Sequence, residues 1–133
     1  MAEKGTIEIK MDRILDDYSK EVRRATANSI DTVAKEAVQK LKNTSPKRSG
    51  TKHVRKYAEG WAIKRKRTGT GVPEVTVYNK THPSLTHLLE NGHEIKNGTG
   101  RSYGDTRGIK HIAPVEEWVT SELPQEIEWE LEK

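Results

Sequence analysis

Cysteine and phenylalanine are both missing from this sequence of 133 residues, and aromatic residues as a whole make up only 5%. Without cysteine there is no disulfide framework and no thiolate metal site, which is compatible with a reducing cytoplasm. Hydrophobic residues make up 32% and charged residues 33%, so a chain of this length can bury only a modest core. We therefore expect one domain over residues 1–133, with a small folded centre and long polar loops.

Long apolar runs are missing as well. None approaches the roughly 20 residues that span a bilayer, and the N-terminus carries no signal-peptide pattern. The sequence therefore predicts a soluble protein that is not exported by a cleaved signal and has no membrane partner.

Periodic apolar residues predict two helices. The first is long and amphipathic, at Arg13–Lys42, with Asp12 as its N-cap. The second opens at Pro114, and Pro124 within it should kink or split the helix. Residues 1–11 are expected to be frayed, although Thr6–Ile9 alternates weakly like an edge strand.

Alternating residues predict a β-hairpin in the middle of the chain. Its strands are Tyr57–Lys66 and Glu74–Tyr78, joined by a glycine-containing turn. A short helix follows, capped by Thr81 and closed by Asn91-Gly92. Ile109–Ile112 is a candidate for one more strand.

Two segments, residues 43–56 and 94–108, have the composition of long mobile loops, and the second has no periodicity. The predicted fold class is α+β, with both long helices packed on a small antiparallel sheet. The residues predicted to form the core are Leu15, Val22, Val33, Leu41, Trp61, Ile63, Val75, Val77, Leu85, Leu88, Leu89, Ile112, Val115, Trp118 and Val119.

Charge is distributed unevenly along the chain. Residues 44–67 hold nine Lys or Arg and one Glu, whereas residues 114–133 hold seven Glu and one Lys. Opposite patches can steer one copy onto another or onto a charged partner, and two solvated faces are the simpler alternative. The residues proposed for such an interface are Lys47, Arg48, Lys52, Arg55, Lys56, Arg101, Tyr103, Arg107, Glu126 and Glu130.

Candidate catalytic chemistry is sparse. His87 and Glu90 form an i, i+3 pair, but no HExxH or other metal-ligand spacing accompanies them. The glycines between residues 98 and 108 neither follow a predicted strand nor open a helix, which excludes a phosphate-binding loop. We therefore expect no catalytic residue, no metal and no cofactor.

Four segments occur in an order that carries a resemblance: SPKRSG (45–50), YAEGW (57–61), VYNKTHPSLTHLLENGH (77–93) and HIAPVEEW (111–118). In this order they resemble the tail-completion, or head–tail joining, proteins of long-tailed bacteriophages. Each segment alone is only a turn, a cap or a core patch, and the ordered set is the specific signal. The resemblance runs from about Thr44 to the C-terminus.

The resemblance implies a structural virion protein, made in the host cytoplasm, that joins the tail to the head. It implies a ring of copies, a hexamer, between a head-connector stopper protein and the tail-tube protein, with DNA passing through the channel without specific binding. A small basic nucleic-acid-binding module is the alternative, because Tyr57 and Trp61 lie within the basic stretch. A metal-dependent enzyme is disfavoured by the histidine spacing.

Overall fold

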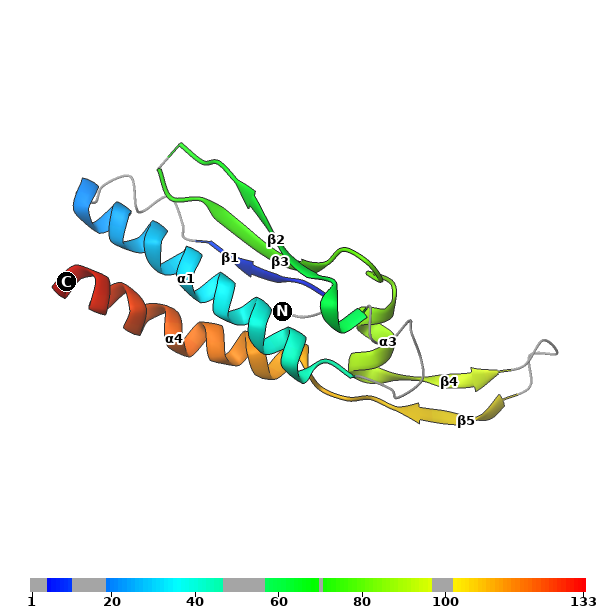
Figure 1. The fold of residues 1–133 in the computed structure, drawn as a ribbon. Helices are drawn as coiled ribbons and strands as arrows, with labels where there is room; N and C mark the ends of the chain where they lie inside the picture. The colour runs from blue at the N-terminus through cyan, green and yellow to red at the C-terminus, as the bar shows by residue number, and fades with distance from the viewer. Residues whose placement is uncertain (1–4, 11–18, 47–56, 70, 97–101) are drawn as a thin grey trace.

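A computed structural model of the chain describes residues 5–10, 19–46, 57–69, 71–96 and 102–133, with the backbone alone for 93–96 and 102–107. The fold is α+β, as predicted: two long helices and a three-stranded antiparallel sheet, with a separate two-stranded hairpin (Figure 1). The elements in chain order are β1 (Ile7–Ile9), α1 (Lys20–Thr44), β2 (Trp61–Lys66), β3 (Glu74–Asn79), α3 (Leu85–Asn91), β4 (Gly92–Lys96), β5 (Ser102–Arg107) and α4 (Ile112–Glu132).

Helix α1 begins later than its sequence pattern predicts. Ser19 is the N-cap: its backbone is extended, and its hydroxyl accepts a hydrogen bond from the Val22 N–H at 3.3 Å. A helix cannot continue through an extended residue, so the predicted start at Arg13 is wrong. Asp12, the predicted cap, lies outside the described residues.

The sheet has the strand order β1–β3–β2, so the predicted pair of central strands is confirmed and Thr6–Ile9 supplies the edge strand β1. Strand β2 begins at Trp61 rather than at Tyr57, because residues 57–59 form a helical turn. The register aligns Ile7, Val77 and Ile63 across the sheet. This row lies on the side that α1 covers, since Ile7 and Val77 are fully buried.

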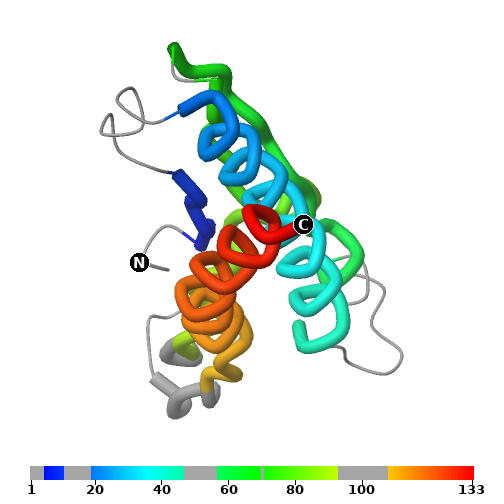
Figure 2. Tube along the Cα trace, turned by 90° about the vertical axis from the view of Figure 1, so that its left-hand side faces the viewer, coloured from blue at the N-terminus to red at the C-terminus, as the bar shows by residue number. Residues whose placement is uncertain are grey.

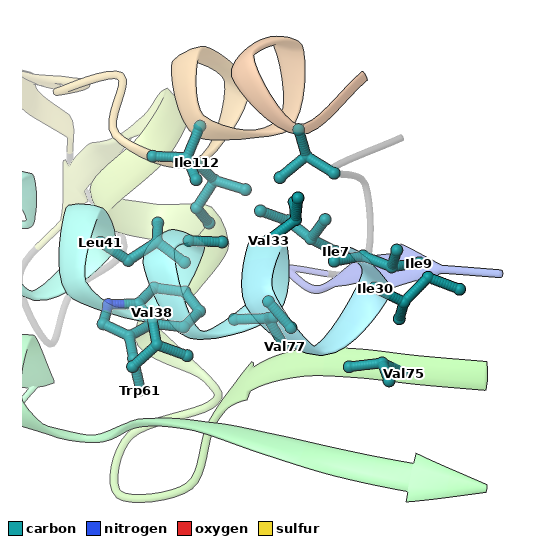
Figure 3. Close-up of a cluster of buried hydrophobic side chains, with 14 of the residues drawn as sticks. Ile7, Ile9, Ile30, Val33, Val38, Leu41, Trp61, Val75, Val77 and Ile112 are labelled. Atoms are coloured by element: carbon teal, nitrogen blue, oxygen red, sulfur yellow. The ribbon is translucent and has the colours of Figure 1, made fainter. Parts of the chain in front are cut away.

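The core lies between α1, the sheet and the first half of α4 (Figure 3). Among the predicted core residues, the buried ones are Val33, Leu41, Trp61, Val75, Val77, Ile112, Val115 and Val119, and the half-buried ones are Val22, Ile63, Leu85, Leu89 and Trp118. Leu15 lies outside the described residues. Leu88 is a correction: it is 41% exposed, because α3 turns Thr86 and Glu90 inward instead.

Helices α1 and α4 pack side by side, as both views show (Figures 1 and 2). Helix α4 begins at Ile112 and runs through Pro124 as one helix, so the predicted strand at Ile109–Ile112 is absent and the helix is not split. A proline reached after three turns removes one backbone donor but leaves the flanking turns held by their packing on α1. No helix in the described part of the chain has the length and apolarity to cross a membrane.

The segment predicted to be a second loop, 94–108, is mostly a β-hairpin. Strands β4 and β5 pair antiparallel, with Gly92 opposite Arg107 and Glu94 opposite Asp105. Figure 1 shows this hairpin extending beyond the ends of both long helices, away from the sheet. Asn97-Gly98, between the two strands in the sequence, is a dipeptide that favours turns.

Candidate interaction site at the root of the hairpin

A cluster of buried polar and aromatic side chains lies where the hairpin leaves the body of the protein. We call it the motif cluster; its residues are Ser45, Tyr57, Trp61, Asn79, Glu90 and His111. None of them is more than 4% exposed. They come from five separate parts of the chain, and each is held by a hydrogen bond to another part. Polar groups buried this deeply are stable only when they are hydrogen-bonded.

Glu90 caps helix α4 from a distance of about twenty residues in sequence. Its Oε1 accepts hydrogen bonds from the backbone N–H groups of His111 and Ile112, both at 2.8 Å, and its Oε2 accepts one from Ala113 at 3.0 Å. These are donors that a helix N-terminus leaves without partners, and the helix dipole favours a negative charge there. Burial alone raises the pKa of Glu90, but the three N–H donors and nearby His111 outweigh it and leave that pKa below its usual value.

His111 continues the network from Glu90 to Tyr57. Its Nδ1 lies 2.8 Å from the Ile109 carbonyl oxygen and 3.0 Å from Glu90 Oε1, two acceptors, so Nδ1 carries the proton. Its Nε2 then accepts the Tyr57 hydroxyl at 2.6 Å. Burial lowers the pKa of His111 and raises that of Tyr57, so the chain of bonds is built from a neutral imidazole and a neutral phenol.

Asn79 fixes the turn that follows β3. Its Oδ1 accepts hydrogen bonds from the backbone N–H groups of Thr81 and His82, at 3.2 and 2.9 Å, and its Nδ2 donates to the Tyr57 carbonyl at 2.6 Å. Thr81, predicted from the sequence to cap the short helix, lies in this turn and not at the N-cap of α3, so that prediction is wrong. The N-cap of α3 is Ser84, which makes no side-chain capping bond. Gly60 leaves room for this turn, since a Cβ there would lie 2.8 Å from Asn79 Oδ1.

Trp61 ties the cluster to the end of α1. Its Nε1 donates to Ser45 Oγ at 2.8 Å, and Ser45 is the C-cap of α1. The rings of Tyr57, Trp61 and His111 pack edge to face, with centroids 5.6 to 6.3 Å apart. Such contacts add to the burial of the rings and restrict their orientation.

Both strands of the hairpin are anchored next to this cluster. Strand β4 starts two residues after Glu90, and Ile109, just beyond β5, donates its N–H to the Leu89 carbonyl at 2.8 Å. The two roots are pressed together at Gly108, where a Cβ would lie 2.5 Å from the Glu90 carbonyl oxygen. The Lys110 Nζ also donates to Asn91 Oδ1 at 2.6 Å. The motif cluster therefore fixes the place and direction in which the hairpin leaves the body.

The cluster is a structural device. Each reactive group in it, the imidazole, the carboxylate and the phenol, is directed at another protein group and is buried. The predicted i, i+3 pair of His87 and Glu90 does not form a site, because His87 is exposed and Glu90 points inward. Within the described residues, no group of three or more His, Cys, Asp or Glu side chains is arranged to hold a metal ion.

The residues predicted for an interface fall mostly beyond what the structure describes. Lys47, Arg48, Lys52, Arg55, Lys56 and Arg101 lie outside the described residues, and so do the side chains of Tyr103 and Arg107 in β5. Glu126 and Glu130 are half-buried on the last turns of α4. The motif cluster is not apparent as a unit in the sequence, whereas the exposed bases of β2 belong to the basic stretch of residues 44–67.

Comparison with known protein families gives a match that covers much of the chain. Residues 9–92, well over half of the chain, match the bacteriophage HK97-gp10 tail-component family. The chain belongs to the HK97-gp10-like family of phage tail components. It is thus a structural component of the virion tail and not an enzyme, as the resemblance implied. No curated protein and no solved structure gives a significant match.

The family match and the motif cluster overlap in the chain. The matched residues contain five of the six cluster residues, all but His111. The four segments that carried the resemblance each supply a member: Ser45, then Tyr57 and Trp61, then Asn79 and Glu90, and last His111. What looked like separate turns and caps in the sequence is one hydrogen-bonded structure in this tail component.

Proposed function

We propose that this tail component completes the end of the tail and joins it to the head connector. In this proposal copies of the chain assemble as a ring, a hexamer, between a stopper protein on the head side and the tail-tube protein on the other. DNA passes through the ring without specific binding. The protein is made in the host cytoplasm and ends in the virion at the head–tail interface.

The observation that carries this proposal is the hairpin β4–β5 and its fixed root. A two-stranded ribbon is marginally stable in water when it stands alone, and a third strand or another surface normally completes it. This hairpin pairs with no other strand in the described part of the chain. Its root, however, is held by the buried bonds of Glu90 and His111. A rigidly rooted arm that needs a covering surface suits a protein whose partners are other subunits.

The alternative, a nucleic-acid-binding module, loses its stacking residues. Tyr57 is fully buried and Trp61 is 2% exposed, and each uses its polar atom within the motif cluster. Neither ring can stack on a base. The exposed bases Lys64, Lys66 and Arg67 remain, but phosphate contacts alone give non-specific and strongly salt-dependent binding.

The proposal is tested with phage from which the coding sequence of this chain has been deleted. We expect filled heads and free tails in electron micrographs, and joined infectious particles when the wild-type chain is supplied in trans. Joined infectious particles without the chain would refute the joining role. A chain with Glu90→Gln tests the fixed root: it keeps the size of the side chain but removes the charge from three N–H donors, so joining should fall. Glu117→Gln, at an exposed position on α4, is the matched control and should join normally.

A further inference from the structure

Strand β2 presents an exposed basic edge. The order β1–β3–β2 leaves one side of β2 without a neighbouring strand among the described residues. Lys64 and Lys66 alternate with Arg65 along this edge strand and so lie on the other face of the sheet, and Arg67 follows the strand; all three are exposed. None of the three has an ion-pair partner within the described part of the chain. Arg65 alone is used internally, at 2.6 Å from Asp31 on α1. We call Lys64, Lys66 and Arg67 the basic edge.

The second half of α4 presents the opposite charge. Glu122, Glu126 and Glu130 are spaced four apart, so they lie along one side of the helix. Glu36 of α1 lies close enough to contribute: partial burial raises the pKa of Glu126, and so do the charges of Glu36, Glu130 and Glu122, in that order. We call these four residues the acidic row. Helix α4 contains no Lys or Arg. Two cations lie beside the row: Lys133 pairs with Glu130 at 3.8 Å, and Arg24 of α1 lines the same cavity as Glu130.

The basic edge and the acidic row lie beside the same stretch of α1, on different sides of it. The Arg65–Asp31 ion pair places the basic edge beside the middle of α1. On the other side, Glu126 lies near Glu36, and Glu130 lines a cavity with Asn28 and Ala25, so the acidic row lies beside the same part of α1. Figure 1 shows α1 between α4 and the strands β2 and β3. One chain therefore carries complementary charges on two different sides at one level.

We infer that copies of this chain associate head to tail, the basic edge of one copy lying on the acidic row of the next. This rests on the proposed ring, and it names the surfaces that would form it. A contact between two different surfaces repeats from copy to copy and closes into a ring when the rotation allows. Lysines along a strand edge oppose the addition of another strand. The partner of β2 is therefore a surface of carboxylates, and the acidic row supplies one within the same chain.

A charge exchange tests the contact. The variant K64E/K66E/R67E reverses the basic edge and E122K/E126K/E130K reverses the acidic row; Arg65 stays, since it pairs with Asp31. Each is supplied in trans to the deletion phage. We expect each to lower the yield of joined particles by about tenfold or more, since like charges then face each other. The two sets combined in one chain restore the attraction and should recover the yield to within about threefold of wild type.

The control is K20E/K35E/K80E, which makes the same charge change at exposed positions outside the basic edge. It should join within about twofold of wild type, and circular dichroism should show that all variants are folded. The proposed contact would be overturned if the two charge-reversed variants fold but their combination does not recover the yield of joined particles. It would also be overturned if the control lowers that yield as much as they do. The joining role would still stand, because that role depends on the deletion phage.

Cross-linking gives a direct second readout, because the chain has no cysteine of its own. Lys66→Cys with Glu126→Cys, oxidised in joined particles, should give a ladder of dimers, trimers and larger species. Each single-cysteine chain should give no ladder, since a head-to-tail contact needs both positions. The pair Lys80→Cys with Glu117→Cys, both exposed, is the matched control. If particles that carry both Lys66→Cys and Glu126→Cys join but give no ladder, the copies meet through other surfaces.

Discussion

The apolar core beneath α1 and the motif cluster at the hairpin root are both buried, but different forces hold them. In the core, side chains such as Ile30, Leu41 and Val77 gain stability from burial, which is non-directional. In the motif cluster, Glu90 and His111 are stable only because particular donors and acceptors meet them at 2.8 to 3.0 Å. The core can accept a volume-conserving exchange, whereas the cluster requires its exact chemical groups.

The difference shows that the hairpin root depends on directional hydrogen bonds, whereas non-directional apolar burial is enough for the core. Burial beneath α1 holds the helix on the sheet, but it does not by itself determine how an arm leaves the domain. At the hairpin root, hydrogen bonds from one carboxylate fix the start of α4 against the end of α3. A protein that acts by presenting an arm to other subunits has a use for such directional bonds at that place.

Removal of the Glu90 carboxylate should produce the largest change. Glu90→Ala leaves three backbone N–H groups of α4 and the Nδ1 proton of His111 without their buried acceptor. We expect the free energy of unfolding to fall by about 3–5 kcal/mol. Chemical denaturation measures it. Glu117→Ala, at an exposed site of α4, should change it by less than about 0.5 kcal/mol. A loss for Glu90→Ala as small as that would mean that water replaces the carboxylate and that the cluster is not dry.

A leucine pair provides the corresponding test of the core. Leu41 is fully buried and Leu88 is 41% exposed. Leu41→Ala should lower the free energy of unfolding by roughly 3 kcal/mol through lost burial and the cavity left behind. Leu88→Ala should lower it by less than about 0.5 kcal/mol. Leu41→Met should recover most of the loss, since it restores volume. In the motif cluster, by contrast, Glu90→Gln keeps the size of the side chain but should remain strongly destabilised. The comparison of Leu41→Met with Glu90→Gln therefore separates the two kinds of burial.

The apolar part of the fold could be predicted from sequence because its signal is periodic. Apolar residues at steps of three or four gave α1 from residue 20 onward, and alternation gave β3 with Val75 and Val77 inward. The errors concern the ends of helices and strands. The apolar periodicity of the first helix extends upstream of its true N-cap at Ser19, and Tyr57, predicted to begin a strand, lies in a helical turn. Boundaries depend on single hydrogen bonds, which periodicity does not report.

The motif cluster could not be predicted because its bonds are distant in sequence. Glu90 and His111 are 21 residues apart, and Tyr57 and His111 are 54 apart. Neither pair lies within one helix or strand, so local periodicity does not reveal it, and the sequence pairs Glu90 only with His87. The hairpin, by contrast, had a local signal in Asn97-Gly98, which the glycine-rich composition of the segment masked.

Two glycines distinguish a crowded hairpin root from an open turn. At Gly108 a Cβ would lie 2.5 to 2.8 Å from backbone atoms of Glu90 and Asn91, whereas at Gly69 it would meet nothing within 4 Å. Gly108→Ala should lower the free energy of unfolding by about 1–3 kcal/mol, because backbone must move. Gly69→Ala should be neutral or slightly stabilising. Thermal melts compare them; equal melting temperatures would show that the two roots are not tightly packed.

Acid should weaken the motif cluster before it affects the apolar core. The folded pKa of His111 lies below its ordinary 6.5 because of burial, so the unfolded chain takes up that proton first as the pH falls. The folded pKa of Glu90 also lies below its ordinary 4.5, so its contribution is present above that pH and is lost below it. Unfolding free energy should therefore fall as the pH drops below about 6.5, and again below about 4.5. In His111→Gln the first decrease should be absent; an unchanged profile would mean that another group titrates.

The smallest effect should belong to the ion pair that joins β2 to α1. The Arg65 guanidinium lies 2.6 Å from Asp31 Oδ1, with the two side chains 50% and 36% exposed. Among the described residues Oδ1 has no hydrogen-bond partner, so the contact is an ion pair that lacks the alignment of a hydrogen bond. Solvent screens so exposed a pair, and a double-mutant cycle of Arg65→Ala and Asp31→Ala should give a coupling of about 0.2–1 kcal/mol. The coupling should shrink further in 1 M salt, where the screening length is about 3 Å. A coupling above about 2 kcal/mol that salt leaves unchanged would place this pair with the directional bonds of the motif cluster, and the basic edge would then be set as rigidly as the hairpin.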